Sequence, residues 1–373
     1  MAILTAAILG RALSKRLKQT WILGELILGM VLGSSMGLPG AGSISDIGDI
    51  GLLLLLFSAG LSLDLDALKR MSLASGIVAA LGVAFPLALG YAIAVLSGFP
   101  HSAALVAGAA LVATSVGVSV SILAEYKMID TKVGTLIIGA AVIDDVIGIM
   151  VLIALHGLLM EGTLDLRNML SPIISAALLY GISLTALVKL GRRISKMVDL
   201  GGEDLLLMGF LVMLAFATLS EGIGLSTVIG AFVGGLVAGR THFRRRLSDF
   251  FELIGNGFFI PIFFVTMGMK FNAAAFLSAG ILVVWITIAA ALGKVIGCGL
   301  GAKATGFGNR ESLAVGIAMI PRAEVALVVI KIGLDGGFMD AHLASVLLAT
   351  IALSVLMTPP LLSRSLKALG AKG

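Results

Sequence analysis

Runs of about 20 apolar residues follow one another along almost the whole chain, separated only by short breaks. A helix needs about 20 such residues to cross the hydrocarbon core of a bilayer, because it rises 1.5 Å per residue. Only 13% of the 373 residues are charged, about half of the share in a soluble domain. This pattern excludes a cytosolic enzyme, a disordered regulator and a secreted disulfide scaffold. It predicts an all-α polytopic membrane protein embedded in the lipid bilayer.

The apolar runs indicate about thirteen transmembrane helices. Their expected ranges are 1–14, 21–36, 48–63, 72–97, 102–125, 132–158, 168–190, 204–220, 224–239, 250–269, 277–300, 311–333 and 341–363.

Lysine and arginine gather on one side of the expected bundle. Of 26 such residues, 20 lie in breaks after odd-numbered spans or in the C-terminal tail, and 2 lie in breaks after even-numbered spans. Because cytoplasmic loops carry the excess of Lys and Arg, we expect a cytoplasmic C-terminus. The net charge of +5 then follows from topology, and no nucleic-acid partner is expected.

The two halves of the chain resemble each other at a nearly constant offset. A shift of 208 residues aligns segment 54–61 with segment 262–269, and a shift of 206 places Gly29 on Gly235. Equivalent spans are seven apart, so they must cross the membrane in opposite directions. Inverted-topology repeats of this kind are typical of secondary transporters. The glycines permit close helix approach, either within the chain or with a second copy.

Two adjacent carboxylates, Asp144 and Asp145, lie in the middle of the sixth span. Each costs about 2.5–3.5 kcal/mol at a helix centre on insertion scales, so a structural role for both is hard to justify. Lys294 is the lysine in mid-span on another helix. One Asp–Lys pair plus a second, unpaired Asp is the simplest arrangement. An unpaired carboxylate can hold a proton or a small cation, but not both, which is the basis of antiport.

Two further spans are expected to be broken. Pro321 interrupts the twelfth span between apolar residues, and Arg322 and Glu324 follow it; a proline removes a backbone hydrogen bond and clashes with the preceding turn. At the equivalent place, the fifth span carries Thr114 and Ser115. Two broken helices would cross near the midplane and direct oxygen atoms at an ion. Arg322 and Glu324 would compensate helix dipoles there, or form a structural salt bridge with each other.

The residues that carry these features resemble a known family. Segment 139–148, Gly-Ala-Ala-Val-Ile-Asp-Asp-Val-Ile-Gly, is similar to the aspartate-pair helix of prokaryotic monovalent cation:proton antiporters. Segments 114–118, 221–226, 230–232 and 321–325 resemble the other signatures of that family in the same order. The nearest resemblance is to NapA-type sodium/proton antiporters and to the membrane domain of KefC-like proteins.

The resemblance implies a sodium/proton antiporter fold in the inner membrane of a prokaryote. The expected homodimer has a dimerisation panel at 1–66 and 201–272, a core at 72–158 and 277–366, and a linker helix at 166–190. Crossed, discontinuous helices lie in the core of such proteins. No cofactor is implied beyond the transported Na+ and H+.

The resemblance also implies roles for the polar residues. Asp145 would bind the sodium ion and the proton, with Thr114 and Ser115 as possible further ligands. Asp144 would pair with Lys294. Relatives with two aspartates and this lysine are generally electrogenic and exchange two protons for each sodium.

We therefore predict an electrogenic sodium (or lithium)/proton antiporter that works by elevator-like alternating access. A potassium/proton antiporter with the same site remains the alternative, since selectivity depends on cavity size. An ion channel is disfavoured because no carbonyl filter motif is found. An enzyme is not expected, because an aspartyl protease needs carboxylates on two facing helices, whereas Asp144 and Asp145 are consecutive.

Overall fold

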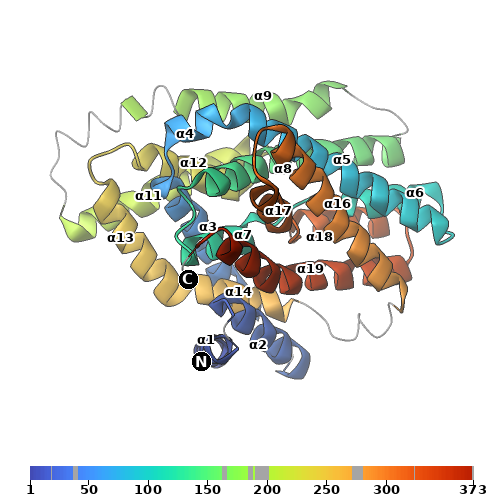
Figure 1. The fold of residues 1–373 in the computed structure, drawn as a ribbon, viewed down its shortest axis with the longest axis horizontal. Helices are drawn as coiled ribbons and strands as arrows, with labels where there is room; N and C mark the ends of the chain where they lie inside the picture. Colours follow the sequence, from blue (N-terminus) through green and yellow to red (C-terminus); the bar gives the residue numbers. More distant parts are fainter. Residues whose placement is uncertain are drawn as a thin grey trace.

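The computed structural model describes residues 1–17, 19–36, 41–161, 166–183, 188–189, 201–270, 280–322 and 324–371. Every regular segment among them is helical (Figure 1), as the sequence predicts. The segments are α1 (Ala2–Arg16), α2 (Trp21–Met36), α3 (Ala41–Ser62), α4 (Leu65–Arg70), α5 (Ser72–Leu96), α6 (His101–Ala110), α7 (Val116–Glu125), α8 (Lys132–His156), η1 (Gly157–Glu161), α9 (Leu166–Ile182), α11 (Gly202–Gly222), α12 (Thr227–Ala238), α13 (Arg244–Ile254), η3 (Gly255–Phe259), α14 (Ile260–Met269), α16 (Leu282–Ala304), α17 (Asn309–Ala318), α18 (Glu324–Asp335) and α19 (Ala341–Ala368).

The helices have the length and composition of a multi-pass membrane protein. Within the described ranges, six continuous helical segments are long and apolar enough to cross a bilayer, and five shorter apolar helices accompany them. These numbers do not test the prediction of thirteen spans. A span that is broken into two short helices is not among the six long ones, and the undescribed residues are left out.

The predicted helix starts differ most from the structure at the third span, which was expected from 48 but begins at Ala41, and at the tenth span. The tenth span was expected over 250–269, but the helix begins six residues earlier and runs through α13, a π-helical turn and α14. Leu247 and Phe251, four residues apart, are both buried and extend the packed face of the helix toward its start. The basic residues before them stay exposed. They therefore form the exposed side of the first turn rather than a loop.

The order of helices repeats at the offset found in the sequence. The starts of α5 and α16 are 210 residues apart, those of α6 and α17 and of α7 and α18 are 208 apart, and those of α8 and α19 are 209 apart. Each half therefore contains the same series: a long helix, a broken helix and a second long helix. The inverted orientation of the two series stays a prediction.

Glycine contacts follow the same repeat. An added Cβ on Gly29 of α2 would lie 2.2 Å from the carbonyl oxygen of Val265 in α14, and the two helices meet at Gly268. At the equivalent contact, a Cβ on Gly235 of α12 would lie 2.2 Å from a carbonyl oxygen of α3, where the helices meet at Gly60. Of the two interpretations left open by the sequence, these glycines serve close packing within the chain.

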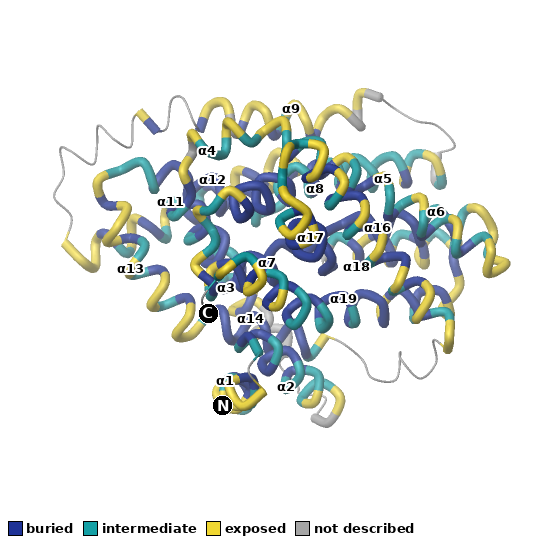
Figure 2. Tube along the Cα trace, viewed as in Figure 1, coloured by how far each residue is buried: buried dark blue, intermediate teal, exposed yellow. Residues whose placement is uncertain are grey.

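Two groups of helices can be followed through their contacts. α14 packs on α2 and α3, and α3 packs on α12; α16 packs on α5, α17 and α19. In Figure 1, α11, α12 and α13 lie to the left, α5, α6 and α16 lie to the right, and α9 runs along the top edge from one group toward the other. Buried residues follow the centre of the molecule, whereas α9 and the outer turns of α13 are largely exposed (Figure 2).

The predicted division into panel, core and linker stays a prediction. Parts of it also lie outside the described residues: 18, 37–40 and 271–272 of the panel, 277–279 and 323 of the core, and 184–187 and 190 of the linker.

Candidate functional site

The aspartate pair lies in the middle of α8, a 25-residue helix that begins where the Thr131 side chain accepts a hydrogen bond from Gly134 N–H. Asp144 is completely buried, while its neighbour Asp145 is only half-buried. Successive helical residues point about 100° apart, which accounts for the difference. The two carboxylates therefore occupy different environments although they are adjacent in sequence.

Asp144 pairs with Lys294 of α16. The Lys294 Nζ donates to the Asp144 Oδ1 at 2.8 Å, and both side chains are 0% exposed. The pair expected from the sequence is therefore present, while its role in transport stays a prediction. The other oxygen of this carboxylate, Oδ2, is buried and accepts no hydrogen bond from the described part of the chain. It is thus an available acceptor.

Two helix breaks meet beside this helix. The chain is non-helical at 111–115, between α6 and α7, and again at 319–322, after α17. The two breaks are joined directly: Ser115 N–H donates to the Pro321 carbonyl at 2.7 Å, and the Thr114 hydroxyl donates to the Met319 carbonyl at 3.4 Å. A third bond, from the hydroxyl of Ser119, reaches the Ala318 carbonyl. Thr114, Ser115 and Pro321, singled out in the sequence, are therefore brought together.

Arg322 neutralises the carbonyl ends of these broken helices. Its side chain is completely buried and donates to the carbonyls of Leu111 at 3.0 Å, Ala290 at 2.7 Å and Ile320. Leu111 ends α6 and Ile320 follows the end of α17. A cation at the C-terminal ends of helices is favourable, because unpaired carbonyls concentrate negative charge there.

These contacts of the Arg322 side chain are those that dipole compensation predicts, while a pair between Arg322 and Glu324 stays a prediction. Glu324 begins α18, and its side chain lies outside the described part, so its role stays a prediction.

Sequence reasoning missed several supporting residues. Glu25 is completely buried in α2, where its Oε1 accepts a hydrogen bond from the Nε of Arg11 at 2.8 Å. The sequence signal that could have predicted this pair is the presence of two opposite charges, Arg11 and Glu25, in neighbouring apolar runs. Ser354 of α19 was also missed; its hydroxyl accepts a hydrogen bond from Arg322 N–H at 3.1 Å.

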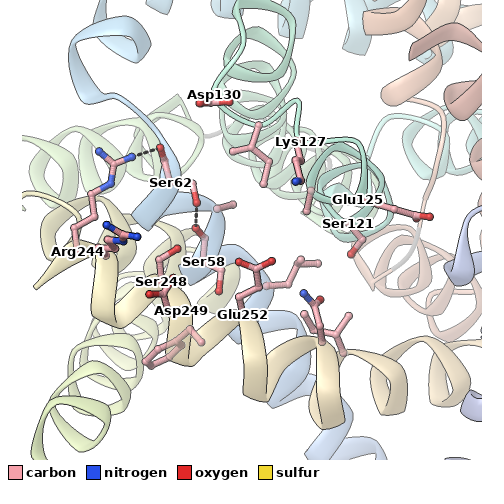
Figure 3. Close-up of a pocket in the computed structure, with 18 of the residues that line it drawn as sticks. Ser58, Ser62, Ser121, Glu125, Lys127, Asp130, Arg244, Ser248, Asp249 and Glu252 are labelled. Carbon is pink, nitrogen blue, oxygen red and sulfur yellow. Dashed lines mark hydrogen bonds between the residues drawn. The ribbon is translucent and has the colours of Figure 1, made fainter. Parts of the chain in front are cut away.

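A charged cavity of about 780 Å³ lies between α3, α7 and α13. Figure 3 shows Asp249 and Glu252 on α13 and Ser58 on α3 on one side of it, with Ser121 and Glu125 of α7 on the other. Lysine and arginine side chains at positions 127, 244 and 245 complete its wall. Basic residues of the kind that the sequence predicts for cytoplasmic loops therefore border this cavity. Its described lining includes α7 and residues 127, 129 and 130 that follow it, and α7 in turn packs on α8.

The family profile described as "Sodium/hydrogen exchanger, transmembrane" matches residues 3–367. The chain belongs to this family. It is 34% identical over 369 residues to the probable Na+/H+ antiporter GerT of Bacillus cereus, covering 98% of this chain and 97% of that protein. It is 32% identical over 367 residues to a Na+/H+ antiporter of Enterococcus hirae, covering 96% and 95%.

The fold is similar to that of the sodium/proton antiporter MjNhaP1 of Methanocaldococcus jannaschii, solved at pH 8. The TM-score is 0.70 over 99% of this chain and 98% of that one, at 18% identity. The family expected from the sequence is thus confirmed. The narrower assignment to NapA-type antiporters stays a prediction.

Proposed function

We propose that this chain exchanges Na+ or Li+ for protons across the cell membrane, with Asp145 as the group that binds them in turn. The observation that carries the proposal is the arrangement around α8: a fully buried Asp144–Lys294 pair beside a half-buried second carboxylate, next to two joined helix breaks. The names of the relatives support the same reaction.

The proposed site has a simple charge balance. In the proton-loaded state Asp145 is neutral and the Asp144–Lys294 pair carries no net charge. Sodium displaces the proton of Asp145 and is also attracted by the free Oδ2 of Asp144, which loosens the pair and lets Lys294 release its proton. Two protons then move one way for each sodium that moves the other, so every cycle transfers one net charge.

The first helix break offers the kind of oxygen atom that a hard cation requires. Sodium prefers carboxylate, hydroxyl and carbonyl oxygens, as calcium does. Thr114 and Ser115 supply hydroxyls at the break, where both are buried. We propose them as supporting ligands, and Pro321, Arg322 and Glu324 as the residues that keep the second break in place.

The movement proposed for the cycle is an elevator-like displacement of the core (72–158 and 277–366) against the panel (1–66 and 201–272). A bare charge near the bilayer centre is costly, so the core moves when a proton or sodium occupies Asp145. In this proposal α9 and its flanking residues link the halves, two copies associate through their panels, and the C-terminus is cytoplasmic. The charged cavity beside α7 would lead sodium from the cytoplasm toward the site.

Proteoliposomes containing the purified protein test the proposal. Sodium-driven proton flux is read from a pH-sensitive dye, and charge movement from a potential-sensitive dye. Asp145→Asn should abolish sodium-driven proton flux, because an amide neither binds nor releases the proton. Asp204→Asn, at an exposed position in the first turn of α11, is the matched control and should transport normally.

Two further results sharpen this test. Lys294→Gln should remove one of the two exchanged protons, so any residual exchange would be electroneutral. Parallel measurements with Na+, Li+ and K+ separate the proposed reaction from potassium/proton exchange. Wild-type sodium-driven flux in Asp145→Asn would refute the assignment of the site.

A further inference from the structure

A second cavity, of about 540 Å³, lies behind the aspartate helix, and its walls are almost entirely apolar. It is bounded by α8, by α9, by the end of α4 and the start of α5, and by Phe232 of α12. Its volume falls in the usual range of small-molecule pockets, about 300–1,000 Å³. We refer to it as the α8–α9 crevice.

The crevice contacts the face of α8 that points away from the carboxylates. The residues of α8 that line it are Gly139, Val142, Ile143, Val146 and Ile147. At about 100° per residue, their mean direction is roughly opposite to the bisector of Asp144 and Asp145. An occupant would therefore support α8 from behind without touching the ion site.

Three polar groups are arranged along one side of the crevice. Lys69 and Ser72 are exposed at its rim, and Ser75 lies one helical turn inside. The Ser75 hydroxyl is buried, lines the crevice, and has no hydrogen-bond partner among the described residues. A buried hydroxyl without a partner costs free energy, so this position favours a ligand with an acceptor oxygen.

The rim is positively charged. The carboxylates nearest to Lys69 in the sequence, Asp64 and Asp66, lie 3.4 and 3.6 Å from the guanidinium of Arg240. No described ion pair includes Lys69, and the described lining contains no acidic residue. Lys69 is therefore available to an anionic group from outside the chain.

The order of these groups matches the parts of a phospholipid. Lys69 of α4 and Ser72 at the first residue of α5 lie together at the rim, where a phosphate would be. Ser75 follows at the depth of an ester carbonyl. From Gly139 to Ile147 the apolar wall of α8 extends from about 10 to about 22 Å beyond the start of that helix, at 1.5 Å per residue. An acyl chain that enters beside Ser75 would run along this wall to mid-membrane.

We propose that the α8–α9 crevice binds one anionic phospholipid from the leaflet that faces Lys69. The phosphate pairs with the Lys69 ammonium, the Ser75 hydroxyl donates to an ester carbonyl, and one acyl chain fills the space between α8 and α9. Basic residues at the membrane surface attract anionic lipids in this way. The lipid is a structural and regulatory ligand that is distinct from the transported ions.

Lipid binding to the full chain tests this directly. Delipidated protein in detergent is titrated with dioleoyl-phosphatidylglycerol or dioleoyl-phosphatidylcholine. The unfolding temperature is recorded, and the retained lipid is quantified by native mass spectrometry. We expect phosphatidylglycerol to raise the unfolding temperature saturably and to be retained in preference to phosphatidylcholine.

Matched variants locate the effect. Lys69→Gln and the crevice-filling Ala177→Phe should reduce the response to phosphatidylglycerol to the phosphatidylcholine level. Arg70→Gln and Leu178→Phe, both exposed and outside the crevice lining, should respond as the wild type does. Equal effects of the two lipids, or an undiminished preference for phosphatidylglycerol in Lys69→Gln, would overturn the proposal. Because Lys69 is exposed, we expect Lys69→Gln to fold even if Ala177→Phe does not. The unfolding temperature and the amount of retained lipid do not depend on transport.

Discussion

Removing one partner of the Asp144–Lys294 pair should destabilise the protein far more than removing an exposed charge. Both side chains are 0% exposed and their charged atoms are 2.8 Å apart. Asp144→Asn leaves a buried ammonium without its counter-ion, and Lys294→Gln leaves a buried carboxylate. Since no solvent screens either group, each change should cost about 3–5 kcal/mol in the free energy of unfolding.

The double variant separates the interaction energy between the two side chains from the effect of each substitution alone. Asp144→Asn combined with Lys294→Gln puts two neutral amides where the ions stood, and removing a whole buried pair is often close to neutral. The double variant should therefore be more stable than the sum of the single costs predicts, by at least about 2 kcal/mol. At 1.4 kcal/mol for each factor of ten, single costs of this size shift the unfolding equilibrium roughly 100-fold or more.

Equilibrium unfolding in mixed detergent micelles, with SDS as denaturant and helicity as signal, provides the measurement. Lys303→Gln is the matched control, because Lys303 lies on the same helix and is exposed; its change should stay within about 0.5 kcal/mol. If Lys294→Gln costs no more than this control, or if the single costs simply add, the pair does not hold α8 and α16 together.

Three further substitutions test the packing with the same assay. Gly29→Ala would place a methyl group 2.2 Å from a backbone carbonyl of α14 and should cost about 1–3 kcal/mol, whereas Gly148→Ala, with nothing within 4 Å, should be neutral or stabilising. Arg322→Gln leaves buried carbonyls at two helix ends without their donor. Each unsatisfied carbonyl should cost about 1–3 kcal/mol in the free energy of unfolding, so the yield of folded protein should fall. A stable, fully active variant would show that the helix ends need no cation. Glu25→Gln should cost less than the aspartate substitution above, because the Arg11 side chain is 39% exposed and can turn to water; an equal cost would contradict this difference in burial.

The sequence predicts those parts of the site in which a residue has a high free-energy cost inside a membrane-spanning helix. Asp144, Asp145 and Lys294 are recognisable because each would be costly without a specific partner or task. Pro321 is recognisable because it cannot continue a helix. Repetition in the sequence then predicts the second break at Thr114, which the structure joins to the first.

The remaining details depend on main-chain positions that a sequence does not display. Arg322 donates to carbonyls of three distant or adjacent segments, whereas its sequence neighbourhood offers only Glu324 as an obvious partner. Arg11 and Glu25 pair because α1 packs on α2, and either residue alone resembles an ordinary interfacial charge. The α8–α9 crevice likewise depends on where α9 rests, which apolar composition alone does not determine.

Proton release on sodium binding is the most direct measurement of the central claim. In weakly buffered solution above neutral pH, adding NaCl to purified protein should release protons saturably, because sodium and hydrogen ions compete for the Asp145 carboxylate. Choline chloride should release none, and Asp145→Asn should lose the release that belongs to this group. Proton release by Asp145→Asn equal to that of the wild type, or sodium binding to wild type without any release, would contradict the account.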